Sequence, residues 1–336
     1  MPIARMITIK DIAAAIGRST ATVDRVLNNR PGVRDATRRA VLEAAEQLHY
    51  PRALRPRRGF DMVLPNAGGF VAALADHARP SGADASAPWT VRVHTCDYAD
   101  PVGIAKLLRG LAESSAGVAL VAVDHIDIRN ALRTLIDRSV PVVTMLTDIS
   151  SLPHQGYVGV DNRVAGRLAG YLIGRFLGDA PANVVVFTGS RAFRGHDERE
   201  MGFRSVVREH FPYLAIREVL EIGEDPEAGF AATTRLLDGE AVAAIYNIGA
   251  GSAGIARALQ AVPRTRKPVF VAHDLSVDTR TYLAAGTIDA VIDQNAAAIV
   301  ERTIARLIAA RGTRLLGVSE MMESRIVLME NIPLDQ

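Results

Sequence analysis

Three polar residues in the C-terminal half, Asn247, Asp274 and Gln294, each lie shortly after the end of a predicted strand. Ligands of parallel α/β sheets bind beyond the carboxyl ends of the strands, so we expect these side chains to converge. Together, amide and carboxylate groups can both donate hydrogen bonds to hydroxyl groups and accept them. The spacing therefore predicts a site for a small hydroxyl-rich ligand, such as a sugar or a polyol.

A second set of residues, near the N-terminus, is suited to nucleic-acid contacts. Thr20, Ala21 and Arg25 lie on the early turns of a short predicted helix. Arg25 can make a bidentate contact to guanine, Ala21 can touch a thymine methyl group, and Thr20 can reach a base or a phosphate. Ser19 and Thr22 can bind phosphate through their hydroxyl groups and the helix N-terminus. The spacing alone fits a helix pair without DNA contacts equally well.

Charge favours the nucleic-acid interpretation. The first 60 residues contain 12 Lys and Arg against 5 Asp and Glu, whereas the whole chain has a formal net charge of +2. A small basic segment joined to an acidic remainder indicates that the basic segment meets a polyanion. The alternative is a basic surface that merely faces solvent.

The basic segment is predicted to form three helices and no strand. Thr8 and Asp11 form an N-cap signature for the first helix, which ends at Gly17. Ser19 can cap the second helix, and a third begins near Asp35. A helix, a short turn and a second helix place the second helix in the major groove of DNA while the first braces it.

Beyond residue 59 the pattern changes to short apolar strands that alternate with helical segments. This βαβ pattern predicts an α/β fold with parallel sheets. Because about nine strands exceed one ordinary doubly wound sheet, we expect two lobes that separate near residues 148–157, with a ligand cleft between them. The expected strands are 62–64, 90–94, 118–123, 140–145, 156–160, 183–187, 242–245, 269–272 and 290–292.

Composition excludes several classes of protein. A chain of 336 residues with 49% hydrophobic and 23% charged residues is long and apolar enough to form two or three folded domains. The single cysteine, Cys96, cannot form an internal disulfide, and we find neither a secretion signal nor a long apolar segment. We therefore expect a cytoplasmic protein without a membrane segment.

A glycine pattern offers a competing interpretation. Gly249, Gly251 and Gly254 form a G-x-G-x-x-G sequence after a predicted strand, and Asp274 follows twenty residues after the last glycine. This spacing is typical of dinucleotide-binding sites. However, the pattern lies late in the chain and no catalytic constellation accompanies it, so a simple strand-to-helix turn is favoured. His273 is the one histidine that we would test, as a hydrogen-bonding residue. We find no signature of an enzyme or a metal site, and we expect no cofactor.

Residues 8–50 resemble the DNA-binding headpiece of the LacI/GalR family of bacterial transcription regulators. The resemblance rests on the run Thr22-Val23-x-Arg25-Val26-Leu27-Asn28 and on the Gly32-Val33 loop, and it extends more weakly to about residue 330. It implies a helix-turn-helix head over residues 1–50, a hinge over 51–60, and a two-lobed periplasmic-binding-protein-like body over 61–336. It also implies a homodimer that reads a pseudo-palindromic operator and responds to a small effector. We add Thr8 and Asn28 to the DNA-binding residues.

The resemblance also implies effector-binding residues. Family members place an Asn, an Asp and a Gln at strand ends comparable to those of Asn247, Asp274 and Gln294. They often place a polar residue and an aromatic one after the first strand, where this chain has Asn66 and Phe70. Phe70 as an ordinary core residue is the alternative. Thr147 and Asp148, after the fourth strand, are weaker candidates.

A highly charged sequence, RGHDERE, resembles the family loop that holds an effector-binding arginine. Here Asp197 stands where many family members have that arginine, and Arg194 and Arg199 flank it. The charge of the ligand is therefore left open. A solvated helix start, in which acidic side chains favour the helix dipole, explains part of this pattern.

The hinge departs from the family pattern. Family members place here a short helix whose Leu wedges into the operator minor groove. In this chain Pro56 disfavours a helix, so we expect Arg52, Arg55 and neighbouring arginines to enter a narrow minor groove as charges. The alternative is that Leu54 still acts as the wedge.

Taken together, the sequence predicts an effector-controlled transcription regulator, most consistent with a repressor of a carbohydrate or polyol operon. The expected effector is a small sugar, polyol or cyclitol. Two other classes stay open: a DNA-binding oxidoreductase built on the glycine pattern, and a small-molecule-binding protein whose head serves only for assembly.

Overall fold

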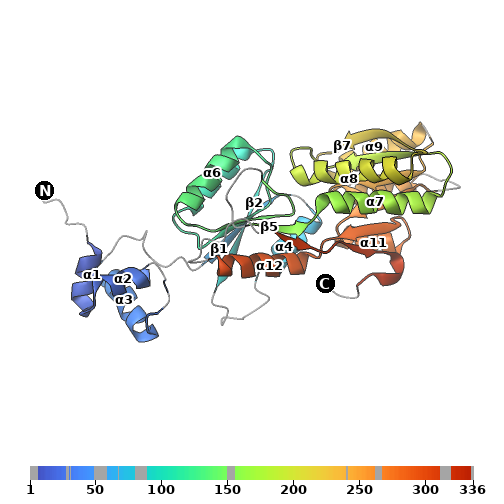
Figure 1. Ribbon diagram of the computed structural model, residues 1–336. Helices are drawn as coiled ribbons and strands as arrows, with labels where there is room; N and C mark the ends of the chain where they lie inside the picture. The colour runs from blue at the N-terminus through green and yellow to red at the C-terminus, as the bar shows by residue number, and fades with distance from the viewer. Residues whose placement is uncertain are drawn as a thin grey trace.

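The computed structural model describes residues 7–27, 30, 32–48, 59–66, 68–79, 89–149, 156–239, 241–261, 267–310 and 319–333. These residues form a helical head and a body of two α/β lobes (Figure 1). The predicted DNA-binding residues Asn28, Arg52, Leu54 and Arg55 lie outside this part of the chain.

The head contains three helices, as the sequence predicts: α1 (Ile9–Ile16), α2 (Thr20–Leu27) and α3 (Asp35–Gln47). The backbone N–H and the hydroxyl group of Thr8 each lie 2.7 Å from a carboxylate oxygen of Asp11, which completes the capping box of α1. Gly17 ends α1 with a φ of 61°, a backbone conformation that glycine adopts without strain. Ile12, Val23, Val26 and Val41 are fully buried and hold the three helices together.

The first lobe is built on a six-stranded parallel sheet in the order β11-β5-β4-β3-β1-β2. Its strands are β1 (Gly59–Pro65), β2 (Thr90–Cys96), β3 (Val118–Leu120), β4 (Val142–Met145), β5 (Tyr157–Val160) and β11 (Glu320–Met322). Every residue of β1 is buried, as expected for a central strand with helices on both faces.

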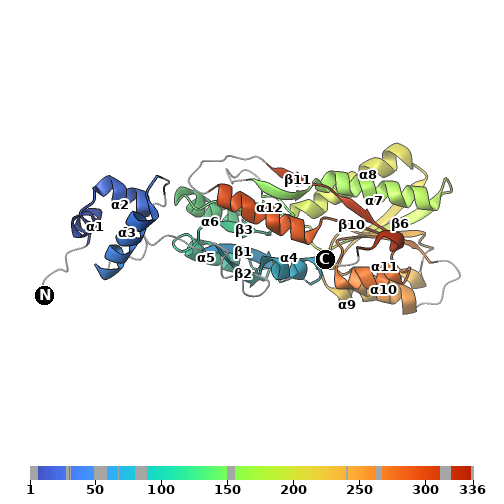
Figure 2. The same cartoon turned by 90° about the horizontal axis from the view of Figure 1, so that it is seen from below.

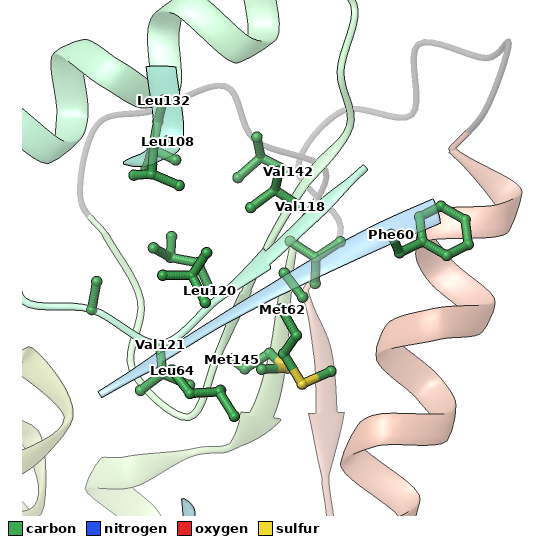
Figure 3. Close-up of a cluster of buried hydrophobic side chains, with 14 of the residues drawn as sticks. Phe60, Met62, Leu64, Leu108, Val118, Leu120, Val121, Leu132, Val142 and Met145 are labelled. Atoms are coloured by element: carbon green, nitrogen blue, oxygen red, sulfur yellow. The ribbon is translucent and has the colours of Figure 1, made fainter. Parts of the chain in front are cut away.

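Four helices cover this sheet: α4 (Phe70–Ala78), α5 (Pro101–Leu111), α6 (Ile126–Asp137) and α12 (Ala296–Ala309). Helices α5 and α6 pack against each other, and so do α4 and α12, which come from opposite ends of the body sequence (Figures 1 and 2). The buried cluster of this lobe includes Phe60, Met62 and Leu64 of β1, Leu108 of α5 and Leu132 of α6. Figure 3 shows part of it, with Phe60 and the two leucines of the helices on different sides of β1. Burial of each such side chain contributes about 1.5 to 3 kcal/mol.

The second lobe repeats the architecture with a sheet in the order β12-β10-β9-β8-β6-β7. Its strands are β6 (Ala182–Thr188), β7 (Leu214–Glu221), β8 (Ala244–Asn247), β9 (Val269–His273), β10 (Ala290–Asp293) and β12 (Arg325–Val327), of which β12 runs antiparallel to β10. Helices α7 (Asn162–Leu177) and α8 (Arg194–His210) lie on one face of this sheet. Helices α9 (Pro226–Asp238), α10 (Ser252–Ala261) and α11 (Val277–Ala284) lie on the other, as Figure 2 shows, and a 3-10 turn, η2 (Met329–Asn331), follows β12.

The chain passes between the lobes three times. It crosses after β5, again between β10 and α12, and finally between β11 and β12. The predicted boundary near residues 148–157 was therefore placed too early, because β5 still belongs to the first sheet. The return of α12 and β11 to the first lobe was not predicted from the sequence.

The nine predicted strands all correspond to observed strands, but three were missed. β7 is an edge strand that mixes apolar residues with charged ones, including exposed Arg217 and Glu221. Strands β11 and β12 are only three residues long. The long-range pairing that defines these strands leaves only a weak local signal.

Candidate functional site

A cavity of about 180 Å³ lies between the two lobes. A volume of this size holds a small molecule and not merely a single water. The first lobe contributes Phe70, Val121, Leu146 and Thr147 to its wall, and the second lobe contributes Glu224, the segment 249–253 and Asp274. The wall therefore combines an aromatic side chain with polar groups from both sheets, as in sites that orient small polar ligands.

Five of the ten predicted effector residues line this cavity: Phe70, Thr147, Arg199, Asp274 and Gln294. Phe70 lines the cavity, but it is only 7% exposed and also packs in the core of the first lobe. Its position is therefore consistent both with a ligand contact and with an ordinary core residue. Asp274 follows β9 and Gln294 follows β10, which are neighbouring parallel strands. The expectation that these two strand ends converge is met, since Gln294 Nε2 donates to Asp274 Oδ1 over 2.8 Å.

Arg199 is a buried cation in the cavity wall. Only 4% of the residue is exposed, although it lies on the highly charged helix α8. Its Nε donates to Asn162 Oδ1 and its Nη1 donates to the backbone oxygen of Ile248, each over 2.8 Å. Nη1 also lies 4.0 Å from Asp274 Oδ2. The guanidinium is thus held in a fixed orientation beside the carboxylate of Asp274.

Asn162 connects Arg199 to the first lobe. Its Nδ2 donates to the backbone oxygen of Leu146 over 2.9 Å, while its Oδ1 accepts from Arg199. Helices α7 and α8 approach closely enough to bury this network because Gly166 faces the backbone of Arg199, where a Cβ would overlap the carbonyl oxygen. Asn162 therefore positions Arg199 and was not identified from the sequence.

Asp274 has an unusual environment. Its φ of 66° lies in the left-handed region, which the segment between β9 and α11 imposes on a non-glycine residue. Burial raises the pKa of its carboxyl group to about 6, against the lowering effect of Arg199 and the hydrogen bond from Gln294. Strained backbone and a raised pKa together are typical of residues that serve a ligand.

Glu224 is a further carboxylate in the cavity wall that the sequence did not reveal. It lies in the turn after the missed strand β7, which ends at Glu221, and has a φ of 63° and a side chain 9% exposed. The backbone N–H of Ala250 donates to Glu224 Oε2 over 2.8 Å. Burial raises the pKa of Glu224, and the hydrogen bond from the Ala250 backbone and the charge of Arg199 oppose this in part.

Two histidines in the wall are uncharged at neutral pH. Burial, reinforced by the charge of Arg199, lowers the pKa of His196 to about 4 and lowers that of His273 well below its usual value. His273 Nε2 lies 2.8 Å from the hydroxyl group of Tyr246, which makes it a hydrogen-bonding residue, as expected.

Five predicted effector residues do not line the cavity: Asn66, Asp148, Arg194, Asp197 and Asn247. Asn66 is exposed. Asp148 accepts from the hydroxyl group of Thr144 over 2.7 Å, and its neighbour Thr147 lies in the wall instead. Asn247 is the last residue of β8, and its Nδ2 donates to the carbonyl oxygens of Gly249 and Ala250 in its own loop.

The charged start of α8 divides into exposed and buried residues. Arg194 donates to Glu198 over 2.8 Å, one turn further along the helix. Asp197 lies 3.8 Å from Arg191, and partial burial raises its pKa. These two residues make contacts at the helix start, whereas Arg199 turns into the cavity wall.

The glycine pattern at 249–254 is explained by packing. A Cβ on Gly249 would crowd Glu224, one on Gly251 would crowd Ile222, and one on Gly254 would overlap the carbonyl oxygen of Pro226. The glycines thus bring the loop against Glu224 and bring α10 against α9. This supports the strand-to-helix turn that the sequence favoured over a dinucleotide site.

The head presents the predicted contact residues on one helix. Thr20, Ala21 and Arg25 are exposed on α2, while Val23 and Val26 are buried beneath them. Ser19 Oγ accepts from the backbone N–H of Thr22 over 3.2 Å and lies 2.9 Å from the Thr22 hydroxyl group. Thr8 caps α1. The geometry of a recognition helix is therefore present.

Comparison with known proteins agrees with these features. Residues 8–52 match the family described as bacterial regulatory proteins, lacI family, and residues 105–312 match the periplasmic binding protein domain. A probable transcriptional repressor from Bacillus subtilis, ExuR, is 23% identical over 241 residues, which cover 69% of each chain. DegA, a transcriptional regulator from the same organism, is 25% identical over 253 residues, which cover 71% of this chain and 72% of that one.

Solved structures share the fold of the body. A glucose-galactose binding protein from Geobacillus stearothermophilus, GanP, superimposes with a TM-score of 0.71 at 21% identity, over 83% of this chain and all of that one. Among the described residues, no helix is both long and apolar enough to span a membrane.

The fold and the site define a DNA-binding transcription regulator with a two-lobed body of the periplasmic-binding-protein type. More specifically, the chain belongs to the LacI family of bacterial regulatory proteins.

Proposed function

We propose that this protein is a transcriptional repressor whose affinity for operator DNA is controlled by a small sugar, polyol or cyclitol bound between the two lobes. The observation that carries the proposal is the cavity itself. Polar side chains from neighbouring strand ends and an aromatic ring from the opposite lobe meet there. The names of ExuR and of the glucose-galactose binding protein GanP support the two halves of this proposal.

The proposed effector site consists of Phe70, Arg199, Asp274 and Gln294, with Thr147, a weaker candidate from the sequence, and Glu224, which is added from the geometry. Phe70 offers its face to the apolar side of a sugar ring. Asp274 accepts from hydroxyl groups, and Arg199 donates to the ring oxygen or to a hydroxyl group. The other predicted residues do not line the cavity, and they can contact the effector only if the lobes move relative to each other when it binds. These residues are Asn66, Asp148, Arg194, Asp197 and Asn247.

The proposed DNA-binding unit is a homodimer that acts in the cytoplasm on a pseudo-palindromic operator. Thr20, Ala21 and Arg25 read base edges, while Thr8, Ser19, Thr22 and Asn28 contact the backbone. Arg52 and Arg55 contact the minor groove between the half-sites, and a wedge formed by Leu54 is the alternative contact. Because β1 begins at Gly59, directly after this segment, a change in the angle between the lobes alters the spacing of the two heads.

A ligand screen followed by DNA binding tests the proposal. Pentoses, hexoses, polyols and cyclitols are screened by thermal shift, since a ligand at one hundred times its dissociation constant stabilises the folded state by about 2.7 kcal/mol. Operator sequences are selected from a random duplex library with the full-length protein. We expect a stabilising ligand to change the affinity for the selected operator.

Two variants separate the functions of the body and the head. Asp274→Ala should lose the response to the ligand and still bind the operator, whereas Arg25→Ala should bind the ligand and lose operator specificity. If reduced nicotinamide cofactor bound and no sugar did, the dinucleotide alternative would replace this proposal.

A further inference from the structure

The three crossovers between the lobes lie at one edge of each sheet. They involve β5 and β11 in the first lobe and β10 and β12 in the second, which occupy the first two positions of their sheets. The opposite edges are formed by β2 in the first lobe and by β7 in the second. A rotation of the lobes about the crossovers therefore moves the residues that follow β2 and β7 further than residues near the crossovers.

A tyrosine bridges the two lobes at these outer edges. Tyr98 follows β2, and its hydroxyl group donates over 2.9 Å to the backbone oxygen of Gly223, which follows β7. The Tyr98 ring also lies against the ring of Phe193, at the start of α8 in the second lobe, with the two centroids 5.4 Å apart. The part of the cavity wall that the structure describes does not include Tyr98. This residue therefore joins the lobes without lining the cavity.

Each partner of this hydrogen bond is held by its own lobe. In the first lobe, Asp97 Oδ1 accepts from the backbone N–H of Ala99 over 2.9 Å, which stabilises the turn that contains Tyr98. In the second lobe, the backbone N–H of Gly223 donates to the backbone oxygen of Gly189, just after β6, over 2.7 Å. Because both groups are fixed within their lobes, a separation of the lobes breaks the contact between them.

The Tyr98 hydroxyl group is a donor at neutral pH. Burial raises the pKa of Tyr98, and nearby carboxylates, with Glu224 first among them, raise it further. The group therefore stays protonated and can donate to a carbonyl oxygen. Another contact between the lobes, from the backbone N–H of Gly195 to Thr147 Oγ1 over 3.1 Å, follows β4, which lies nearer to the crossover edge. Tyr98 is thus placed where a single hydrogen bond resists opening most effectively.

We propose that Tyr98 is a latch that stabilises the closed arrangement of the two lobes and thereby sets the ratio of open to closed molecules before any effector binds. The hydrogen bond to Gly223 and the ring contact with Phe193 both require the lobes to be close together. Loss of one hydrogen bond of this kind changes a two-state ratio by about 2- to 10-fold. The latch follows from the geometry of the body alone, whereas its effect on DNA binding rests on the proposed function.

Distances between the lobes test the latch in the full-length protein without a ligand. Lys106 on α5 and Ala231 on α9 are exposed, one in each lobe, and Lys106→Cys and Ala231→Cys in a Cys96→Ser background carry spin labels. Labelled chains are diluted with unlabelled ones, and electron–electron double resonance measures the distance distribution. We expect the ratio of open to closed molecules to rise about 2- to 10-fold in Tyr98→Phe and further in Tyr98→Ala. Equal distributions in the labelled background and in Tyr98→Phe would overturn the proposal.

Tyr213→Phe is the matched control. The Tyr213 hydroxyl group donates to Asp179 Oδ1 over 3.1 Å within the second lobe, so the loss of this hydrogen bond should leave the distances between the lobes unchanged. If Tyr213→Phe opened the lobes as much as Tyr98→Phe does, the effect would not depend on the contact between the lobes and the proposal would be refuted. The melting temperature of each variant reports whether it is folded.

Operator binding separates the latch from the proposed function. Unliganded wild type and Tyr98→Phe are titrated into the selected operator duplex, and we expect the affinity to change by about 2- to 10-fold, although Tyr98 lies in neither the head nor the described cavity wall. If the distances shift and the operator affinity does not, the latch is confirmed and the coupling in the proposed function is refuted. If the operator affinity shifts and the distances do not, the latch is refuted.

Discussion

Replacement of Asp274 by Asn should change how stability depends on pH. Burial raises the pKa of this carboxyl group from its ordinary value of 3.8 to about 6 in the folded protein. The folded state therefore binds the proton more tightly than the unfolded state does. The stability that this proton contributes is fully present below about pH 4 and is lost as the pH rises through about 6.

The size of the effect follows from the pKa values. A shift from 3.8 to about 6 corresponds to about 3 kcal/mol, at about 1.4 kcal/mol for each pKa unit. This is an upper value, because the side chain keeps 20% of its surface exposed. Asp274→Asn removes the buried charge and keeps an acceptor for Gln294. Relative to the variant, the wild type should lose up to about 3 kcal/mol of unfolding free energy between about pH 4 and pH 7.

Urea unfolding of both proteins without ligand, followed by circular dichroism, measures this difference. Groups that do not interact with Asp274 contribute equally to both proteins and cancel in the difference. The charges of Glu224 and Asp293, which help to raise the pKa of Asp274, are part of the difference that is measured. Asp278→Asn is the control, since Asp278 is an exposed carboxylate on the adjacent helix α11. If the difference between wild type and Asp274→Asn stayed constant across this range, the argument from burial would be wrong.

Three further predictions concern the head, the packing of the body and the hinge. Arg25→Ala should cost about 1 to 3 kcal/mol on a selected operator and little on random DNA, measured by fluorescence anisotropy; equal losses on both would refute a base contact. Gly254→Ala should destabilise the protein by about 1 to 3 kcal/mol in urea unfolding, because its Cβ would overlap the carbonyl oxygen of Pro226, whereas Gly110→Ala, on a helix surface with open space, should stabilise it by up to about 1 kcal/mol. The opposite signs would contradict the packing argument. The arginine-rich hinge should bend operator DNA only slightly in circular-permutation assays, and a sharp kink that disappears in Leu54→Ala would show that Leu54 wedges between bases instead.

The parts of the fold that local patterns determine were predictable. Thr8, Asp11 and Gly17 define both ends of α1 in the sequence and in the structure. The alternation of apolar strands with helices predicted two parallel sheets. The crossovers were not predictable in the same way, because strand β11 joins the first sheet only through pairing with β5, which is distant in the sequence.

The cavity was only partly predictable for the same reason. Asn247 was expected just beyond the end of a strand, but its backbone pairs with Phe187, so the strand extends to this residue and its side chain turns into its own loop. Glu224 was missed because the edge strand before it was not recognised: charged residues such as Arg217 and Glu221 interrupt its apolar residues. Strand ends depend on long-range pairing, and they decide which side chains reach a ligand.

The burial of Arg199 also depends on tertiary structure. A charged sequence at a helix start is usually solvated, as Arg194 and Asp197 illustrate. Arg199 becomes buried because Gly166 allows α7 and α8 to approach closely. No feature of the charged sequence itself distinguishes the arginine that enters the cavity from the one that does not.

The coupling between the cavity and the head is tested most directly by operator affinity with and without ligand. Full-length protein is titrated by fluorescence anisotropy into its selected operator duplex, alone and with a saturating concentration of the best ligand from the thermal-shift screen. Because allosteric coupling is typically about 1 to 3 kcal/mol, we predict a change in operator affinity of about 5- to 150-fold that disappears in Asp274→Ala. A ligand that binds the wild type in calorimetry and leaves the operator affinity unchanged would contradict the account.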